Sequence, residues 1–257
     1  MNKKQQKIIG NTLILAFIAC GLVWVCGKFV HLNSTTFTDN AQVRQVLTEA
    51  SPDVVIHCAA WTAVDAAEDA ENIGKVRAIN AEGTAHIAAV CKDYKPLNVY
   101  GQTKLEGELA VANTVDKFFI VRIAWVFGKN GNNFIKTMLN IGKKYDTLRV
   151  VNDQIGTPTY TLDLSRLLID MAETEKYGYY HATNEGGFIS WYDFAREIFR
   201  QAGYATKVNP VTTEEYGLSK AARPFNSRLD KSKLRTAGFT PLPDWKDALA
   251  RYLKEIQ

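Results

Sequence analysis

The chain has 257 residues, of which 46% are hydrophobic and 23% charged, so it is long enough and apolar enough to bury a globular core. Its 31 basic against 27 acidic side chains leave a net charge of +4 without basic runs between aromatic residues, which argues against a nucleic-acid partner. The four cysteines have neither the spacing of metal ligands nor the density of a disulfide scaffold, and we assign no metal site.

The first predicted element is a hydrophobic segment within residues 1–30. No charged residue occurs from Ile8 to Gly27, and twenty helical residues would span roughly 30 Å, the thickness of the hydrocarbon core of a bilayer. With lysines on both sides, this run predicts a transmembrane helix that would anchor the protein in a membrane. The alternative interpretation is a buried strand and helix, because Asn11 and three glycines dilute the run.

After this segment, the pattern alternates between helix and strand. Helices are expected over residues 41–50, 80–90, the stretch after Tyr100, 132–144, 162–175, 190–203 and 243–256, and strands over residues 52–60, 117–128, 148–153 and 178–183. Asn132 or Asn133 can cap the helix at 132–144, and Ser190 can cap the one at 190–203. Strands separated by helices predict an α/β fold with a doubly wound parallel sheet.

The stretch YGQTKLEGE places Tyr100 and Lys104 four residues apart, on the same side of a predicted helix. A lysine ammonium near a phenol lowers the pKa of the phenol, because positive charge favours the phenolate. Such a phenol could donate a proton to a developing alkoxide near neutral pH. This spacing alone is common, however, and is more often a surface pair on an ordinary helix. Asp65 and Glu68, earlier in the chain, are interpreted as charges at the start of a helix.

Several longer motifs give the Tyr–Lys pair a context. In chain order they are PDVVIHCAAWTAVDAAE, NAEG, PLNVYGQTKLEGE, VRIAWVFG, GNNFIKTML, VVNDQIGTPT, SWYDFAREIF and RPFNSRLDKSKL. From about Thr38 to the C-terminus, the sequence closely resembles the dTDP-4-dehydrorhamnose reductases, which are extended short-chain dehydrogenases/reductases. The resemblance implies a cytoplasmic oxidoreductase that uses NADPH to reduce the C4 ketone of dTDP-4-dehydrorhamnose, giving dTDP-L-rhamnose.

The resemblance also implies a Rossmann-type NADPH-binding region over residues 31–160. A smaller sugar-nucleotide-binding region over residues 161–257 would be interleaved with it. NADH is an alternative cofactor, Mg²⁺ is a further candidate without an assigned ligand, and a homodimer is compatible with the resemblance.

Individual roles are carried over by position. Tyr100 would be the proton donor, and Lys104 would hold the nicotinamide ribose and lower the pKa of Tyr100. The other residues implied for the cofactor are Ala59, Ala60 and Trp61, and those implied for the substrate are Trp125, Asn133, Arg223, Asn226 and Arg228. Trp125 would pack on the sugar, and the others would surround the nucleotide end, where an arginine fork suits a diphosphate. Each also has a structural interpretation: Trp125 as core, Asn133 as a helix cap, and the arginines as solvated charges.

Two parts of the family pattern are missing. Gly10, Gly21 and Gly27 lack the Gly-x-x-Gly-x-x-Gly spacing of the turn that receives the cofactor pyrophosphate. Residues 84–99 are too few for the helix, strand and Ser-Thr-Asp-Tyr-Val-Phe loop that the family has in this interval. A catalytically impaired member acting as a binding or regulatory subunit, and a truncated gene product, are therefore the alternatives to the working reductase.

Overall fold

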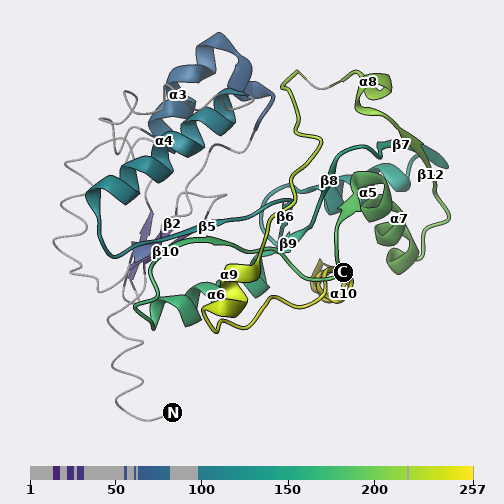
Figure 1. Cartoon of the computed structure of the whole chain (residues 1–257). Helices are drawn as coiled ribbons and strands as arrows, with labels where there is room; N and C mark the ends of the chain where they lie inside the picture. Colours follow the sequence, from purple (N-terminus) through teal and green to yellow (C-terminus); the bar gives the residue numbers. More distant parts are fainter. Residues whose placement is uncertain are drawn as a thin grey trace. The chain divides into compact units, whose positions relative to one another are not determined.

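The structure is a computed structural model that describes residues 14–17, 22–25, 28–31, 55–56, 61, 63–81, 98–218 and 220–256 (Figure 1). The chain divides into two compact units. The first unit comprises Met1–Asp116 and Lys220–Ala222, and the second comprises Lys117–Ser219 and Arg223–Gln257.

A four-stranded sheet in the order β3-β2-β1-β4 lies in the first unit. Strands β1 (Ile14–Phe17), β2 (Leu22–Val25) and β3 (Lys28–His31) pair antiparallel in succession. Strand β4 (Val55–Ile56), within the strand expected over residues 52–60, pairs parallel with β1. The helix expected over residues 41–50 lies outside the described residues, as does nearly all of the one expected over 80–90.

The expectation of a transmembrane helix over residues 8–27 is wrong. Two stretches of this segment are the strands β1 and β2, whose backbone groups bond to neighbouring strands rather than within a helix. Their isoleucine, valine, phenylalanine and tryptophan residues are types that strands favour. Among the described residues, we find no helix with the length and apolar character that crossing a membrane requires.

Two adjacent helices also belong to the first unit. A short 3₁₀ turn, η2 (Ala66–Glu68), leads into α3 (Ala70–Asn80), and α4 (Val99–Thr114) runs beside α3 (Figure 1). The two backbones come close at Gly107, where an added Cβ would lie 2.5 Å from the carbonyl oxygen of Asn80. Only glycine leaves room for this approach.

Three parallel strand pairs form the second unit's sheets. Strand β5 (Phe119–Arg122) pairs with β10 (Gly178–His181), β6 (Val126–Phe127) with β9 (Thr159–Tyr160), and β7 (Thr147–Val151) with β12 (Lys207–Val211). A fourth pair, β8 (Ile155–Gly156) with β11 (Ile189–Ser190), is antiparallel. The parallel pairs confirm the predicted α/β class. The single strand expected over residues 117–128 is instead divided, because Trp125 breaks it with a φ of 49°.

Four of the second unit's helices match expected ones: α5 (Phe134–Gly142), α6 (Thr161–Ala172), α7 (Trp191–Ala202) and α10 (Trp245–Ile256). The short helices α8 (Thr213–Tyr216) and α9 (Ser232–Thr236) were not predicted. As expected, α7 begins after Ser190, which forms a capping box with Asp193, and ends at Gly203 with a φ of 73°. The larger core joins α5, α7 and α10 through aromatic rings that include Phe127, Tyr160, Phe194, Trp245 and Tyr252.

A buried carboxylate ties three elements of the second unit together. The side chain of Asp163 on α6 is 0% exposed and accepts two hydrogen bonds from Arg251 of α10, at 2.8 and 2.7 Å. It also accepts one from Nδ2 of Asn184 at 2.8 Å, and Oδ1 of Asn184 accepts the backbone N–H of Tyr160 at 2.8 Å. A buried charge needs such partners, because water is not there to solvate it.

We expect Asp163→Ala to lower the free energy of unfolding by about 3–5 kcal/mol, because it leaves Arg251 without its buried partner and removes one of the two acceptors of the Asn184 amide. Asp247, the other carboxylate that Arg251 contacts, is 58% exposed, so Asp247→Ala should cost less than about 1 kcal/mol. Urea unfolding of both variants measures the difference. Equal losses of unfolding free energy in the two variants would show that the buried Asp163–Arg251 pair contributes no more stability than the exposed one.

Candidate active site

The Tyr–Lys pair lies in the first two turns of α4. Asn98 caps this helix, its Oδ1 accepting the backbone N–H of Gly101 at 2.8 Å. Nζ of Lys104 lies 5.9 Å from the centre of the Tyr100 ring. Tyr100 and Lys104 therefore lie close together on the helix, as the spacing predicts.

The pKa of Tyr100 is displaced in the direction opposite to the expected one. The phenol is partly buried, and loss of solvation raises its pKa above the usual 10.0, because the anionic form is harder to accommodate. The sequence interpretation considered only the neighbouring ammonium and expected a lowered pKa. In this structure burial is the cause that shifts the pKa of Tyr100, and it raises that pKa, so the phenol is protonated throughout the neutral range.

A chain of hydrogen bonds runs from the segment before η2, through the end of α3, to the turn of α4 that carries Tyr100. The backbone N–H of Trp61 donates to Oδ1 of Asn80 at 2.9 Å, and Nδ2 of Asn80 donates to Oγ1 of Thr103 at 3.1 Å. Thr103, which is 0% exposed, donates to the carbonyl oxygen of Tyr100 at 3.0 Å. This chain links Trp61, a predicted cofactor residue, to the turn that carries the phenol.

Sequence reasoning missed Asn80, whose one available signal is its position inside the NAEG motif. The other two predicted cofactor residues, Ala59 and Ala60, lie outside the described residues.

A second set of hydrogen bonds involves Glu106 of α4. Its carboxylate is only 8% exposed and accepts hydrogen bonds from Arg77 of α3 at 3.1 Å and from Gln102 at 2.9 Å. The helix is thus fixed against α3 by buried polar groups that are mutually satisfied.

Trp125 occupies an unusual backbone position in the second unit. Its φ of 49° is uncommon for a bulky residue, and such outliers gather at functional sites. Its ring stacks on Trp191, with ring centres 3.8 Å apart and planes inclined by 15°. Gly156 of β8 lies beside it: an added Cβ would come within 2.8 Å of the indole and 2.7 Å of Oγ of Ser227.

The segment with the predicted substrate residues runs along β8. The backbone N–H of Ile155 donates to the carbonyl oxygen of Phe225 at 2.9 Å, and that of Ser227 donates to the carbonyl oxygen of Ile155 at 2.8 Å. The guanidinium of Arg228 lies 5.5 Å from the centre of the exposed Phe188 ring. Oδ1 of Asn226 accepts the backbone N–H of Arg228 at 3.1 Å. The structure thus brings Trp125, Asn226 and Arg228 to the surroundings of one short strand.

Asn133 has a different set of contacts. Its Oδ1 accepts the backbone N–H of Lys136 at 3.1 Å, which caps α5, and its Nδ2 donates to the carbonyl oxygen of Gly128 at 3.0 Å and to the hydroxyl of Tyr252 at 2.9 Å. These bonds agree with the helix-cap interpretation. A direct contact with substrate stays a prediction.

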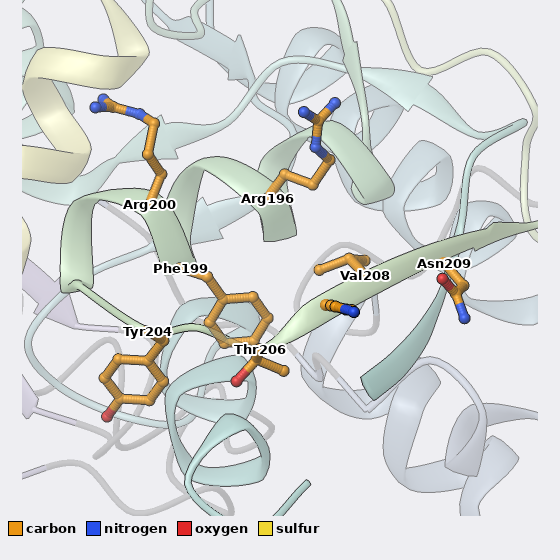
Figure 2. Close-up of a pocket in the computed structure, with 8 residues that line it drawn as sticks. Arg196, Phe199, Arg200, Tyr204, Thr206, Val208 and Asn209 are labelled. Atoms are coloured by element: carbon orange, nitrogen blue, oxygen red, sulfur yellow. The ribbon is translucent and has the colours of Figure 1, made fainter. Parts of the chain in front are cut away.

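A shallow pocket of about 500 Å³ lies between α7 and β12 (Figure 2). None of the predicted site residues lines it; its walls are Arg196, Phe199, Arg200, Tyr204, Thr206, Lys207, Val208 and Asn209. Arg200 is already paired with Glu197 at 2.6 Å. In the part of the chain that the structure describes, no three His, Cys, Asp or Glu side chains gather to hold a metal ion, so Mg²⁺ gains no ligand set.

Comparison with known proteins points in the same direction as the geometry. A family model described as the RmlD substrate binding domain matches residues 9–95 and 93–257. The two matches meet within residues 84–99, the interval that is too short for the family's strand and loop. The dTDP-4-dehydrorhamnose reductase of Aggregatibacter actinomycetemcomitans is 38% identical over 252 residues, covering 82% of this chain and 84% of the relative.

Two further relatives agree with this match. The dTDP-4-dehydrorhamnose reductase of Streptomyces griseus is 39% identical, covering 82% of this chain and 80% of the relative. A crystal structure of the Bacillus anthracis dTDP-4-dehydrorhamnose reductase in complex with NADP has a TM-score of 0.77 and 38% identity, covering 85% of this chain and 86% of that one.

Parallel strand pairs connected through helices, with a Tyr-x-x-x-Lys pair in the first turns of a capped helix, agree with the short-chain dehydrogenase/reductase class of the matching relatives. Within this class, the chain belongs to the dTDP-4-dehydrorhamnose reductase family.

We expect Gly156→Ala to displace Trp125 or Ser227, because the added methyl group has no room beside either. The cost should be about 1–3 kcal/mol of stability, together with a changed environment of the indole. Thermal unfolding and tryptophan fluorescence measure the two effects. Gly74→Ala is the matched control, because an added Cβ there meets nothing within 4 Å and alanine favours a helix. Unchanged fluorescence in Gly156→Ala would contradict the close packing.

We expect the Tyr100 phenol to ionise only above pH 10, because its pKa is raised from 10.0 by burial. The difference between the tyrosinate absorbance titrations of the wild type and of Tyr100→Phe isolates this one group. Circular dichroism at each pH checks that the protein is still folded. Ionisation near neutral pH would mean that the Lys104 ammonium outweighs burial.

Proposed function

We propose that this chain reduces the C4 ketone of dTDP-4-dehydrorhamnose to the alcohol of dTDP-L-rhamnose, with NADPH as the reductant. The observation that carries the proposal is the Tyr100–Lys104 pair at the capped start of α4. It occurs in a chain that is 38% identical, over most of its length, to a dTDP-4-dehydrorhamnose reductase. The NADP in the Bacillus anthracis relative supports the choice of cofactor.

Tyr100 supplies the proton in this reaction. With its pKa raised by burial, the phenol is protonated at neutral pH, which is the form that a proton donor needs. The proton passes from the phenol oxygen to the C4 oxygen of the sugar as that oxygen gains negative charge. The Lys104 ammonium favours the phenolate that remains, until a proton from solvent restores it.

Cofactor binding is assigned to the start of α4 and the segment before η2. Lys104 would hold the nicotinamide ribose, and the segment of Ala59, Ala60 and Trp61 would let NADPH lie close to the strand that precedes it. The backbone of Trp61 fits this role, because Asn80 of α3 binds it and also binds Thr103 of α4, the helix that carries the Tyr–Lys pair. When bound, NADPH supplies the hydride that C4 receives. NADH is the alternative cofactor and would donate the same hydride.

Substrate binding is assigned to the second unit. Trp125 would pack on the sugar, supported by the stacked ring beneath it and by its unusual backbone. Arg223 and Arg228 would bind the diphosphate, for which two guanidinium groups are well suited. Asn226 and Asn133 complete the predicted set. Arg228 is exposed, with its guanidinium over the Phe188 ring, so it is accessible to a ligand.

NADPH oxidation with dTDP-4-dehydrorhamnose tests the proposal directly. The wild type should oxidise NADPH only when the keto sugar is present, and Tyr100→Phe should lower kcat by about 10²–10⁴-fold, the usual contribution of a positioned proton donor. Tyr145→Phe is the matched control, because Tyr145 is 59% exposed and lies outside the assigned site, and it should retain wild-type kcat.

Two results would contradict the reductase. One is a folded wild type that leaves NADPH unoxidised at every concentration of keto sugar. The other is a Tyr100→Phe variant as active as the Tyr145→Phe control, which would remove the phenol from the chemistry.

A further inference from the structure

A short piece of the C-terminal half of the chain belongs to the first unit. Lys220–Ala222 is part of that unit, whereas the residues on both sides of it belong to the second. We call these three residues the strap. Lys220 forms an ion pair with Asp69, and the backbone N–H of Ala221 donates to Oδ1 of Asp65 at 2.9 Å. Ala221 is 3% exposed, so the strap is seated on the first unit and is not a loose connection.

Asn98 joins the strap to the helix that carries Tyr100. Its Oδ1 accepts the N–H of Gly101 at 2.8 Å and caps α4, while its Nδ2 donates to the carbonyl oxygen of Ala222 at 3.0 Å. One amide thus fixes two backbones at once. Tyr100 follows Asn98 by two residues, and Arg223 follows Ala222 directly.

Acidic side chains around η2 bind the two segments that the Asn98 amide joins, the start of α4 and the strap. Oε1 of Glu68 accepts the N–H of Val99 at 2.9 Å, at the start of α4, while Asp65 and Asp69 hold the strap. Asp65 and Glu68, interpreted from the sequence as charges at the start of a helix, therefore bind the strap and the start of α4 respectively. Both segments that Asn98 joins are thus held by carboxylates on either side of η2.

An ordinary helix cap would not need an amide. Serine and aspartate cap helices about as well as asparagine, because the cap itself uses only the side-chain oxygen. The Nδ2 donor of Asn98 has a separate use, at the peptide that leads into Arg223. Placing a charged side chain correctly to within about 1 Å can decide whether bound substrate is productive.

We propose that Asn98 is a positioning residue for substrate binding, which acts through the strap on Arg223. The inference rests on the proposed function, in which Arg223 binds the diphosphate. It predicts that the two halves of the Asn98 amide have separable effects. The oxygen maintains α4 and thereby kcat, and the nitrogen maintains the strap and thereby KM.

Two variants separate these effects. Asn98→Ser and Asn98→Asp keep a capping oxygen and remove the donor to Ala222, so KM for the dTDP-sugar should rise about five- to tenfold while kcat stays within about twofold, as expected for one lost hydrogen bond. Asn98→Ala removes both functions, and kcat should fall as well. Lys220→Ala, which removes the outer attachment of the strap, should raise KM in the same direction. Lys117→Ala, which breaks an exposed ion pair in the second unit, should change neither constant.

Unchanged KM in both Asn98→Ser and Asn98→Asp, with an active wild type, would overturn the inference. Equal losses of kcat in the serine and alanine variants would also overturn it, because they would make Asn98 a cap alone. If the wild type itself shows no turnover, the proposed reductase fails separately, and dTDP becomes the probe. Weaker dTDP binding to Asn98→Ser than to the wild type would then support the positioning role, and equal binding would refute it.

Discussion

The hydrogen bond from the Asn80 amide to the Thr103 hydroxyl is the contact on which the candidate site of the first unit depends. Thr103 is completely buried, so its hydroxyl must have a partner, and the side chain that satisfies it is also the one that holds the backbone of Trp61. Gly107 lets α3 and α4 approach closely enough for this bond to form. The distance between the end of α3 and the phenol is therefore set by buried polar atoms, with little freedom to change.

The second unit is organised around a different constraint, the break at Trp125. A continuous strand from residue 117 to residue 128 would place its residues in one sheet, but the left-handed backbone of Trp125 separates β5 from β6. The two halves then pair with different partners, β10 and β9. The indole packs on Trp191 beside β8, along which the segment that contains Asn226 and Arg228 runs.

Local signals in the sequence predicted much of this fold. Ser190 and Gly203 mark the limits of α7 because a capping box and a left-handed glycine depend on only a few neighbouring residues. The N-terminal segment was misjudged because a short apolar run does not by itself distinguish helix from strand. Strand β12 was missed because it exists only through its pairing with β7, and the sequence around Lys207–Val211 contains a proline. The closeness of Tyr100 and Lys104 was predicted from their spacing, whereas the bond of Asn80 was not, since its partner Thr103 lies 23 residues away.

The strap has a consequence for how this protein can be divided or recombined. The chain passes from one unit to the other three times, after residues 116, 219 and 222, so the first unit is not a continuous stretch of the gene. A fragment that ends at Asp116 would leave Asp65 and Asn98 without the backbone groups they hold. An exchange of N-terminal halves between two related genes would join an Asn98 from one parent to an Ala222 from the other. The acceptor at position 222 is a backbone carbonyl, which any residue supplies, so this contact depends on the asparagine at 98 and on the path of the strap, although 124 residues separate the two positions.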